Sequence, residues 1–95
     1  MFVLHIELQV KPGQQQVLEK IYVEDFQPAI SGQSGFRSAS LLRPADDGAG
    51  DYLLSLTFDQ QTSQQKWVST DIHQQVWPQI ESQCLKFSVK PYNTL

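Results

Sequence analysis

The chain has 95 residues, of which 40% are hydrophobic and 18% charged, and its formal net charge is −3. This length predicts one small domain, residues 1–95, whose limited core would gain stability from a second subunit. Only seven Lys and Arg residues are present, without a basic stripe, which argues against nucleic-acid binding. The first apolar run is interrupted by His5 and Glu7, so neither a signal peptide nor a membrane span is predicted. A single cysteine, Cys84, favours a reducing compartment, and we expect the cytoplasm.

The first half of the chain predicts a strand, a helix and a strand. Along residues 2–10, aliphatic side chains (Leu4, Ile6, Leu8 and Val10) alternate with mostly polar ones, which is typical of a half-buried strand. Residues 14–27 carry apolar side chains at helical spacing, with Gln and Glu on the outer face. Pro28 is expected to break or restart that helix, and residues 31–35 to form a loop. Residues 36–43 then predict a second strand.

The next segment predicts a third strand and two helices. Residues 44–50 have the composition of an exposed connection, and residues 51–59 alternate as a strand. Thr62 or Ser63 can cap the helix that follows, on which Trp67 lies. After it, Ser69-Thr70-Asp71 looks like a helix end followed by a new N-cap, which predicts a second short helix with His73, Val76 and Trp77. Pro78, in that second helix, is of the residue type that kinks helices.

A last strand completes the predicted fold. It begins near residue 85, and Pro91 is expected to end it. The order strand, helix, strand, strand, helix, strand predicts an α+β, ferredoxin-like β-α-β-β-α-β fold with a four-stranded antiparallel sheet and its helices on one face. The apolar face of the sheet is expected to hold Leu4, Ile6, Leu8, Leu54, Leu56, Leu85, Phe87 and Val89.

The opposite face of the predicted sheet mixes polar and apolar side chains. It is expected to show Val3, His5 and Glu7 on the first strand, and hydroxyl side chains on the third. Such a face fits either open surface or a partly wet dimer interface. The interface is favoured because oligomerisation is a usual supplement to a small core. We therefore expect a homodimer that forms through this sheet face.

Several short features occur in a fixed order along nearly the whole chain. They are Val10-Lys11-Pro12-Gly13, Gly35-Phe36, Leu41-Leu42-Arg43, Asp51-Tyr52, Phe58, and Trp67 with Thr70-Asp71 just after it. In this order and spacing the chain resembles the antibiotic biosynthesis monooxygenase (ABM) domain of the dimeric α+β barrel superfamily. The resemblance implies a homodimer whose sheets pack face to face, and a pocket in each subunit between sheet and helices. Family members include oxygenases of polycyclic aromatics that need no cofactor, quinol oxygenases and haem-degrading enzymes.

The resemblance points to one candidate catalytic residue and four candidate substrate contacts. Trp67 stands where the family often has a His or Trp facing the pocket, and Phe58 where a Trp often ends the third strand. His73 stands where the aromatic-oxidising branch has a tyrosine. A neutral histidine there could act as a general base toward a phenol or hydroquinone. Trp77 and Tyr22 are the remaining candidate contacts.

Each of these residues also has a plainer interpretation. Trp67 could be an ordinary core tryptophan, and His73 a surface histidine beside Asp71. His5 fits a surface or interface position better than a catalytic one. Two histidines and one cysteine, far apart in sequence, form no recognisable ligand set, so no metal is expected.

The resemblance does not extend to the residues that bind haem. In the haem-degrading branch a histidine on the pocket helices ligates iron, and an Asn on the first strand assists. Trp77 and Ile6 hold these two places here, and neither side chain can do that chemistry. We therefore expect no haem and no other cofactor.

Three functions remain open on the sequence. The first is a cofactor-independent monooxygenase acting on a small aromatic or quinol-type substrate in a pocket between sheet and helices. The second is a non-catalytic dimeric α+β barrel protein that binds a small ligand, and the third is a purely structural protein with a collapsed pocket. An open cavity that His73 faces favours the first, a wholly apolar cavity the second, and a filled core the third. The sequence does not identify the substrate.

Overall fold

The computed structural model describes residues 1–46 and 50–95. The expected connection at residues 44–50 therefore lies partly outside the described residues. No helix in the described residues is long and apolar enough to cross a membrane. In chain order the elements are β1 (Phe2–Val10), α1 (Gln15–Ile21), the π-helix η1 (Tyr22–Phe26), α2 (Gln27–Ser31), β2 (Phe36–Leu42), β3 (Tyr52–Phe58), α3 (Gln61–Val68), α4 (Asp71–Glu81) and β4 (Cys84–Asn93).

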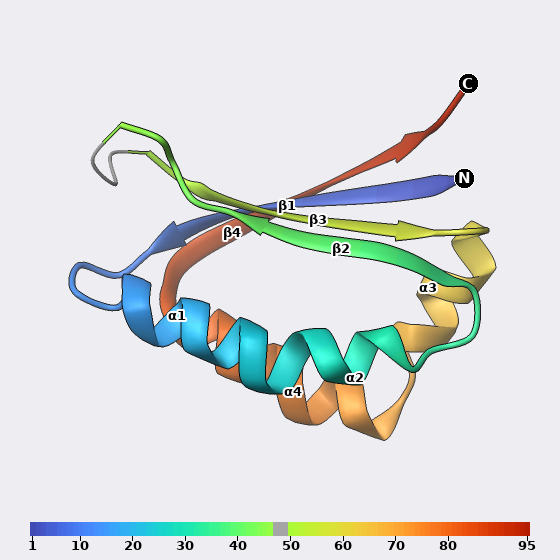
Figure 1. Cartoon of the computed structure of the whole chain (residues 1–95), viewed down its shortest axis with the longest axis horizontal. Coiled ribbons are helices and arrows are strands. Elements are labelled where there is room, and N and C mark those ends of the chain that lie inside the picture. The colour runs from blue at the N-terminus through green and yellow to red at the C-terminus, as the bar shows by residue number, and fades with distance from the viewer. Residues whose placement is uncertain (47–49) are drawn as a thin grey trace.

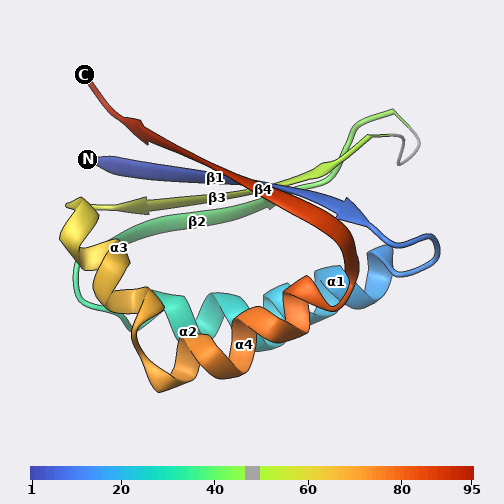
Figure 2. The same ribbon diagram turned by 180° about the vertical axis from the view of Figure 1, so that it is seen from behind.

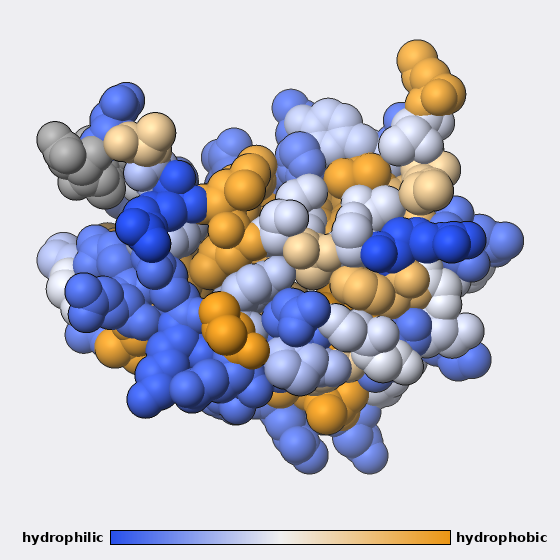
Figure 3. Space-filling view, viewed as in Figure 1, coloured by the Kyte–Doolittle hydropathy of each residue, from blue (hydrophilic) through white to orange (hydrophobic). Residues whose placement is uncertain are grey.

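The four strands form one antiparallel sheet in the order β2-β3-β1-β4. All the helices lie on one face of this sheet, as the two opposite views in Figures 1 and 2 show. The first and last strands pair with each other because each crossover helix carries the chain past a neighbouring strand. This arrangement confirms the predicted ferredoxin-like fold. On the side seen in Figure 3, the surface over the helices is largely hydrophilic, and the hydrophobic residues there form separate small groups.

The two central strands have the alternating burial that the sequence predicted. Leu4 pairs with Leu56 and Ile6 pairs with Leu54, and all four side chains are buried against the helices. The intervening residues point to the opposite face, where His5 pairs with Ser55 and both are half-buried. A period of two along both strands thus creates the helix-covered core and a second, mixed face.

The edge strand β4 agrees only in part with the prediction. Phe87 and Val89 pair with residues on the helix-facing side of β1, yet they are 39% and 49% exposed. The reason is that β4 is an edge strand, and the described helices do not cover its inner side fully. Leu85 is 60% exposed because a bulge at this point places Cys84, and not Leu85, in the buried position opposite β1. The predicted sheet face is therefore confirmed for Phe87 and Val89, which lie on the helix-facing side but are only partly covered, and was wrong for Leu85.

Pro91 does not end β4, which continues to Asn93. An edge strand tolerates proline because one side of its backbone needs no hydrogen-bond partner. The predicted strand end at Pro91 was wrong for this reason.

The first helical segment continues through Pro28, where the sequence predicted a break or a restart. Pro28 lies in the first turn of α2, and the π-helix η1 precedes it. A proline lacks an N–H and its ring crowds the preceding turn, and a wide π turn relieves that crowding. The helix therefore persists to Ser31, with Phe26 and Ile30 buried on its inner face.

The helix pair α3 and α4 agrees with one predicted cap and not with the other. The N-cap of α3 is Gln60, without a side-chain cap hydrogen bond, so a cap at Thr62 or Ser63 was wrong. The Ser63 hydroxyl instead donates to the Asp59 carboxylate over 2.7 Å. Thr70 is the N-cap of α4, and its hydroxyl oxygen accepts a hydrogen bond from the His73 backbone N–H over 3.2 Å. This cap sets where α4 begins and so fixes the rotation of His73 about the helix axis.

Candidate functional site

A cavity of about 180 Å³ lies between the helical face of the sheet and the helices α3 and α4. The sheet contributes aliphatic side chains to it, and the helices contribute aromatic and polar ones. The full lining is Leu4, Ile6, Phe26, Leu56, Gln64, Trp67, Val68, His73, Trp77, Phe87 and Val89.

Trp67 is a fixed wall of this cavity. Its side chain is only 2% exposed, although one side of the ring borders the cavity. The Phe26 ring meets it edge-on, with centroids 5.9 Å apart. Such edge-to-face packing stabilises the position of the indole beyond the effect of the apolar area that it buries.

His73 lies between the two tryptophans. Its ring centroid is 5.0 Å from that of Trp67, at 84°, and 6.4 Å from that of Trp77, at 19°. Burial lowers the pKa of His73, because the charged imidazolium loses hydration there. The side chain is therefore neutral at pH 7. Among the described residues that line the cavity, it is the only one that titrates near neutral pH.

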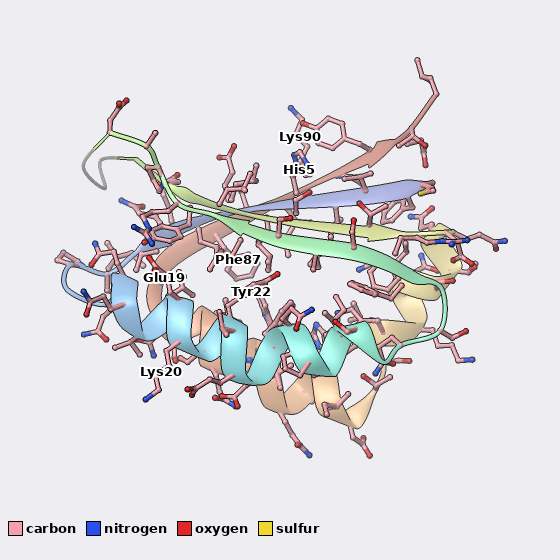
Figure 4. The ribbon with its side chains drawn as sticks, in the orientation of Figure 1. His5, Glu19, Lys20, Tyr22, Phe87 and Lys90 are labelled. Carbon is pink, nitrogen blue, oxygen red and sulfur yellow. The ribbon has the colours of Figure 1, made fainter. Side chains whose placement is uncertain are left out.

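The edge strand closes another side of the cavity. The rings of Trp77 and Phe87 pack edge to face, with centroids 5.1 Å apart. Figure 4 shows Phe87 pointing from β4 into the space between the sheet and the helices. Phe87 is therefore partly exposed for two reasons, since it lies on a sheet edge and its ring lines the cavity.

The five predicted site residues separate into two groups. Trp67, His73 and Trp77 come together in the cavity lining. Phe58 and Tyr22 are buried and are not among the described lining residues. They support the site from behind, because Tyr22 stacks on Phe26, with centroids 6.0 Å apart, and Phe58 belongs to the same core cluster as Trp67.

His5 lies far from this site in the fold. It is on the outer face of the sheet with Lys90, as Figure 4 shows, and its ring centroid is 5.0 Å from that of Tyr92. This placement agrees with the surface or interface interpretation and not with a catalytic one.

Sequence reasoning missed several lining residues. Phe26 enters through the π-helix, whose extra residue changes the direction of the side chains, and no local pattern predicts that turn. Gln64 lies one helical turn before Trp67, so the i, i+3 spacing could have found it. Phe87 and Val89 were assigned to the correct sheet face, but not to the cavity.

A second group of polar side chains lies at the hairpin end of the same sheet face. The Tyr52 hydroxyl donates to Glu19 Oε2 over 2.5 Å, and Arg43 Nη2 donates to Glu19 Oε1 over 3.1 Å. Burial and the neighbouring Glu19 carboxylate raise the pKa of Tyr52 to about 12. We call Glu19, Arg43 and Tyr52 the Glu19 cluster.

The cavity residues do not suit a haem. The places that bind it in the haem-degrading branch, Ile6 and Trp77, both line the cavity and supply no ligand. An imidazole that binds iron through one ring nitrogen normally donates a hydrogen bond from the other. Nδ1 of His73 instead lies 3.2 Å from the amide nitrogen of Gln74, which is itself a donor. Among the described residues, no group of three His, Cys, Asp or Glu side chains could hold a metal ion. The absence of haem stays a prediction.

The family model of antibiotic biosynthesis monooxygenases matches residues 1–78. The chain belongs to the antibiotic biosynthesis monooxygenase family. The match runs from β1 into α4 and so includes Trp67, His73 and Trp77. No curated protein matches this ABM chain.

Solved structures share the fold of the ABM chain over almost its whole length. A candidate antibiotic biosynthesis monooxygenase from Nitrosomonas europaea is 14% identical, with a TM-score of 0.85 over 100% of this chain and 99% of that one. A conserved protein from Methanosarcina mazei Go1 is 12% identical, with a TM-score of 0.85 over 99% and 92%. A mutant of MhuD with two manganese protoporphyrin IX molecules bound per active site is 20% identical, with a TM-score of 0.82 over 100% and 95%. At these identities the likeness shows the fold alone.

Proposed function

We propose that residues 1–95 act as one domain of a cofactor-independent monooxygenase, which oxidises a small aromatic or quinol-type substrate in the cavity beside Trp67. The observation that carries this proposal is the position of His73, a neutral imidazole held between two indole rings in an otherwise largely apolar cavity. A flat substrate ring would pack on aromatic and aliphatic side chains, and its oxygen would meet the imidazole. The cavity volume suits one or two small rings, since a cavity of about 150 Å³ holds benzene.

The proposed reaction uses dioxygen as the oxidant. A phenol would lose the hydroxyl hydrogen and one ring hydrogen and gain one oxygen atom, which gives a quinone. The other oxygen atom would leave with the two hydrogens as water. A phenolate is more electron-rich than a phenol and gives up electrons to dioxygen more readily. His73 would assist by favouring the ionised substrate, and a neutral imidazole at pH 7 is suited to that step.

The proposal also includes a homodimer that forms through the outer face of the sheet. The supporting observation is that Val3, Leu53 and Thr57 lie half-buried on this face, and Tyr92 is exposed at its edge. A second copy would cover this mixed surface and give the closed barrel that the family resemblance implies. The proposed compartment is the cytoplasm, since Cys84 is a free thiol.

The alternative is ligand binding without chemistry. It is favoured by the predominance of apolar side chains in the lining, which would hold an aromatic molecule whether or not His73 takes part.

Oxygen uptake with a series of hydroquinones and naphthols tests the enzyme proposal. We expect turnover, and a loss of about a hundredfold in kcat in His73→Gln, the lower end of the range for loss of one group that stabilises a developing oxyanion. The matched control is His5→Gln, which changes the chain's other histidine on the opposite sheet face. Binding without oxygen uptake would favour the alternative, and the absence of both would reject both functions.

Sedimentation at tens of micromolar protein tests the dimer. We expect a dimer for the wild type and a monomer for Ser55→Arg, which puts a charge at the centre of the outer face. Gln27→Arg adds the same charge to the exposed surface of α2 and should stay dimeric. A monomeric wild type would overturn the dimer proposal without affecting the cavity.

A further inference from the structure

We propose that Gln74 is a positioning residue that sets the tautomer of His73, so that the imidazole offers an N–H group to the cavity and selects ligands with an acceptor oxygen. The selectivity rests on the proposed function, because it requires that a ligand enters this cavity. The tautomer itself is a property of the free protein and can be tested separately.

The geometry around the Gln74 amide determines which atom donates. Its Nε2 lies 3.0 Å from the backbone carbonyl oxygen of Val68 and 3.2 Å from Nδ1 of His73. A carbonyl oxygen only accepts hydrogen bonds, so the amide must turn its NH₂ group, and not its oxygen, toward Val68. The second hydrogen of that NH₂ group is then available to Nδ1. Because an amide nitrogen does not accept hydrogen bonds, Nδ1 of His73 must be the acceptor.

A neutral imidazole has one acceptor nitrogen and one donor nitrogen. With Nδ1 accepting, the proton of His73 lies on Nε2. Among the described residues Nε2 has no hydrogen-bond partner, and it is not among the buried polar atoms left unsatisfied. It is therefore accessible from outside the protein and available to a ligand as an N–H donor.

The Nε2–H group of His73 is the main polar group that the cavity offers to a ligand. Among the described lining residues no carboxylate, ammonium or guanidinium is present, and Gln64 has the only side-chain amide. Lys66 and Asp71, the charged residues nearest to His73 along the chain, are both exposed. A phenolate or a quinone carbonyl would accept the Nε2–H bond, whereas an ammonium group, which only donates, would face another donor. A phenolate would gain most, because hydrogen bonds to ionised oxygen are the stronger ones.

The same geometry defines how His73 would act on a phenol. Taking up the phenol proton at Nε2 is excluded while Nε2 already carries a hydrogen. His73 would instead stabilise the phenolate oxygen through its N–H, and the phenol proton would go to water. Gln74 acts only through His73, since it is not among the described lining residues.

Long-range proton–nitrogen NMR of ¹⁵N-labelled protein tests the tautomer. We expect the Nε2–H pattern for His73 at neutral pH. In Gln74→Glu the new carboxylate would accept from Nδ1, so the pattern should switch to Nδ1–H and the pKa of His73 should rise. Gln75→Glu adds the same charge at the next position and should change neither. An Nδ1–H pattern in the wild type, or equal effects of the two variants, would overturn the inference.

Calorimetric binding of 1,4-naphthoquinone and of naphthalene tests the selectivity. The quinone should bind about five- to tenfold more weakly to Gln74→Glu, as expected for one lost hydrogen bond, while naphthalene binding stays unchanged. Gln75→Glu should bind both as the wild type does. Equal loss of both ligands, or of neither, would overturn the selectivity. If neither ligand binds the wild type while the tautomer switches as expected, the role of Gln74 stands and the proposed function and its selectivity fail.

Discussion

The cavity at the Trp67 end and the Glu19 cluster at the hairpin end lie on the same face of one sheet, but they differ in how their polar groups are satisfied. In the Glu19 cluster, both carboxylate oxygens of Glu19 accept hydrogen bonds, one from Tyr52 and one from Arg43. In the cavity, Nδ1 of His73 has an internal partner and Nε2 has none among the described residues.

This difference separates a stabilising cluster from a binding site. A polar group whose partners are all internal contributes to the fold and has little left to offer a ligand. A polar group left open in an apolar hollow is costly unless something from outside satisfies it. The hollow beside the Glu19 cluster is the larger one, at about 530 Å³, so the candidate site is identified by its chemistry and not by its size.

The largest expected effect is on the cavity wall. Trp67→Ala removes an almost fully buried ring and should lower the free energy of unfolding by about 3–5 kcal/mol. Trp77→Ala removes a half-buried ring and should cost clearly less. Urea unfolding measures both. Equal costs would mean that Trp67 is not the better packed of the two walls. Ligand binding is better compared in Trp77→Ala, because that variant should disturb the fold less.

An intermediate effect is expected in the Glu19 cluster. Tyr52→Phe removes the hydrogen bond to the Glu19 carboxylate and should lower the free energy of unfolding at neutral pH by about 1–2 kcal/mol. The folded-state pKa of Tyr52, about 12, lies above its ordinary value of 10. Its contribution is therefore present below pH 10 and is lost as the pH rises through 12.

Unfolding measured between pH 7 and 12 checks this prediction. The wild type should lose stability in the alkaline part of this range, and Tyr52→Phe should lose less. Tyr92→Phe, which changes an exposed tyrosine, should follow the wild type. A wild-type profile that matches Tyr52→Phe throughout would show that the cluster does not stabilise the fold.

The smallest expected effect is the acid titration of His73. Burial lowers its pKa from the ordinary 6.5, so the folded state holds the proton less firmly than the unfolded state. The stabilisation is present above pH 6.5 and is lost as the pH falls through the folded-state pKa. We expect a small loss of stability, because the ring is only half-buried.

Thermal unfolding between pH 7 and 5 measures this contribution of His73 to stability. His73→Gln should remove that part of the pH dependence, whereas His5→Gln should retain it. Retention of the full slope in His73→Gln would mean that other groups cause it and that the cavity does not disfavour the charged imidazole.

Much of the fold and part of the candidate site could be predicted from the sequence. The alternation in β1 and β3 predicted both faces correctly, because a strand that is covered on one side has a strict period of two. A new N-cap within Ser69-Thr70-Asp71 was also predicted, and the structure identifies it as Thr70, whose hydroxyl oxygen accepts from the N–H three residues later. Trp67, His73 and Trp77 were predicted as site residues and lie together, while Phe58 and Tyr22 stand behind the cavity.

The sequence by itself therefore determined the elements, their order and the faces of the central strands, because these depend on local spacing and on a repeated period. Only the tertiary structure decided how much of β4 the helices leave uncovered, since exposure depends on what lies above a residue and not on its own pattern. It also decided the π turn at Phe26 and the contact of Gln74 with His73. That contact is accompanied by a hydrogen bond from Gln74 to the backbone carbonyl of Val68, a residue of the preceding helix that the packing of α3 against α4 brings close.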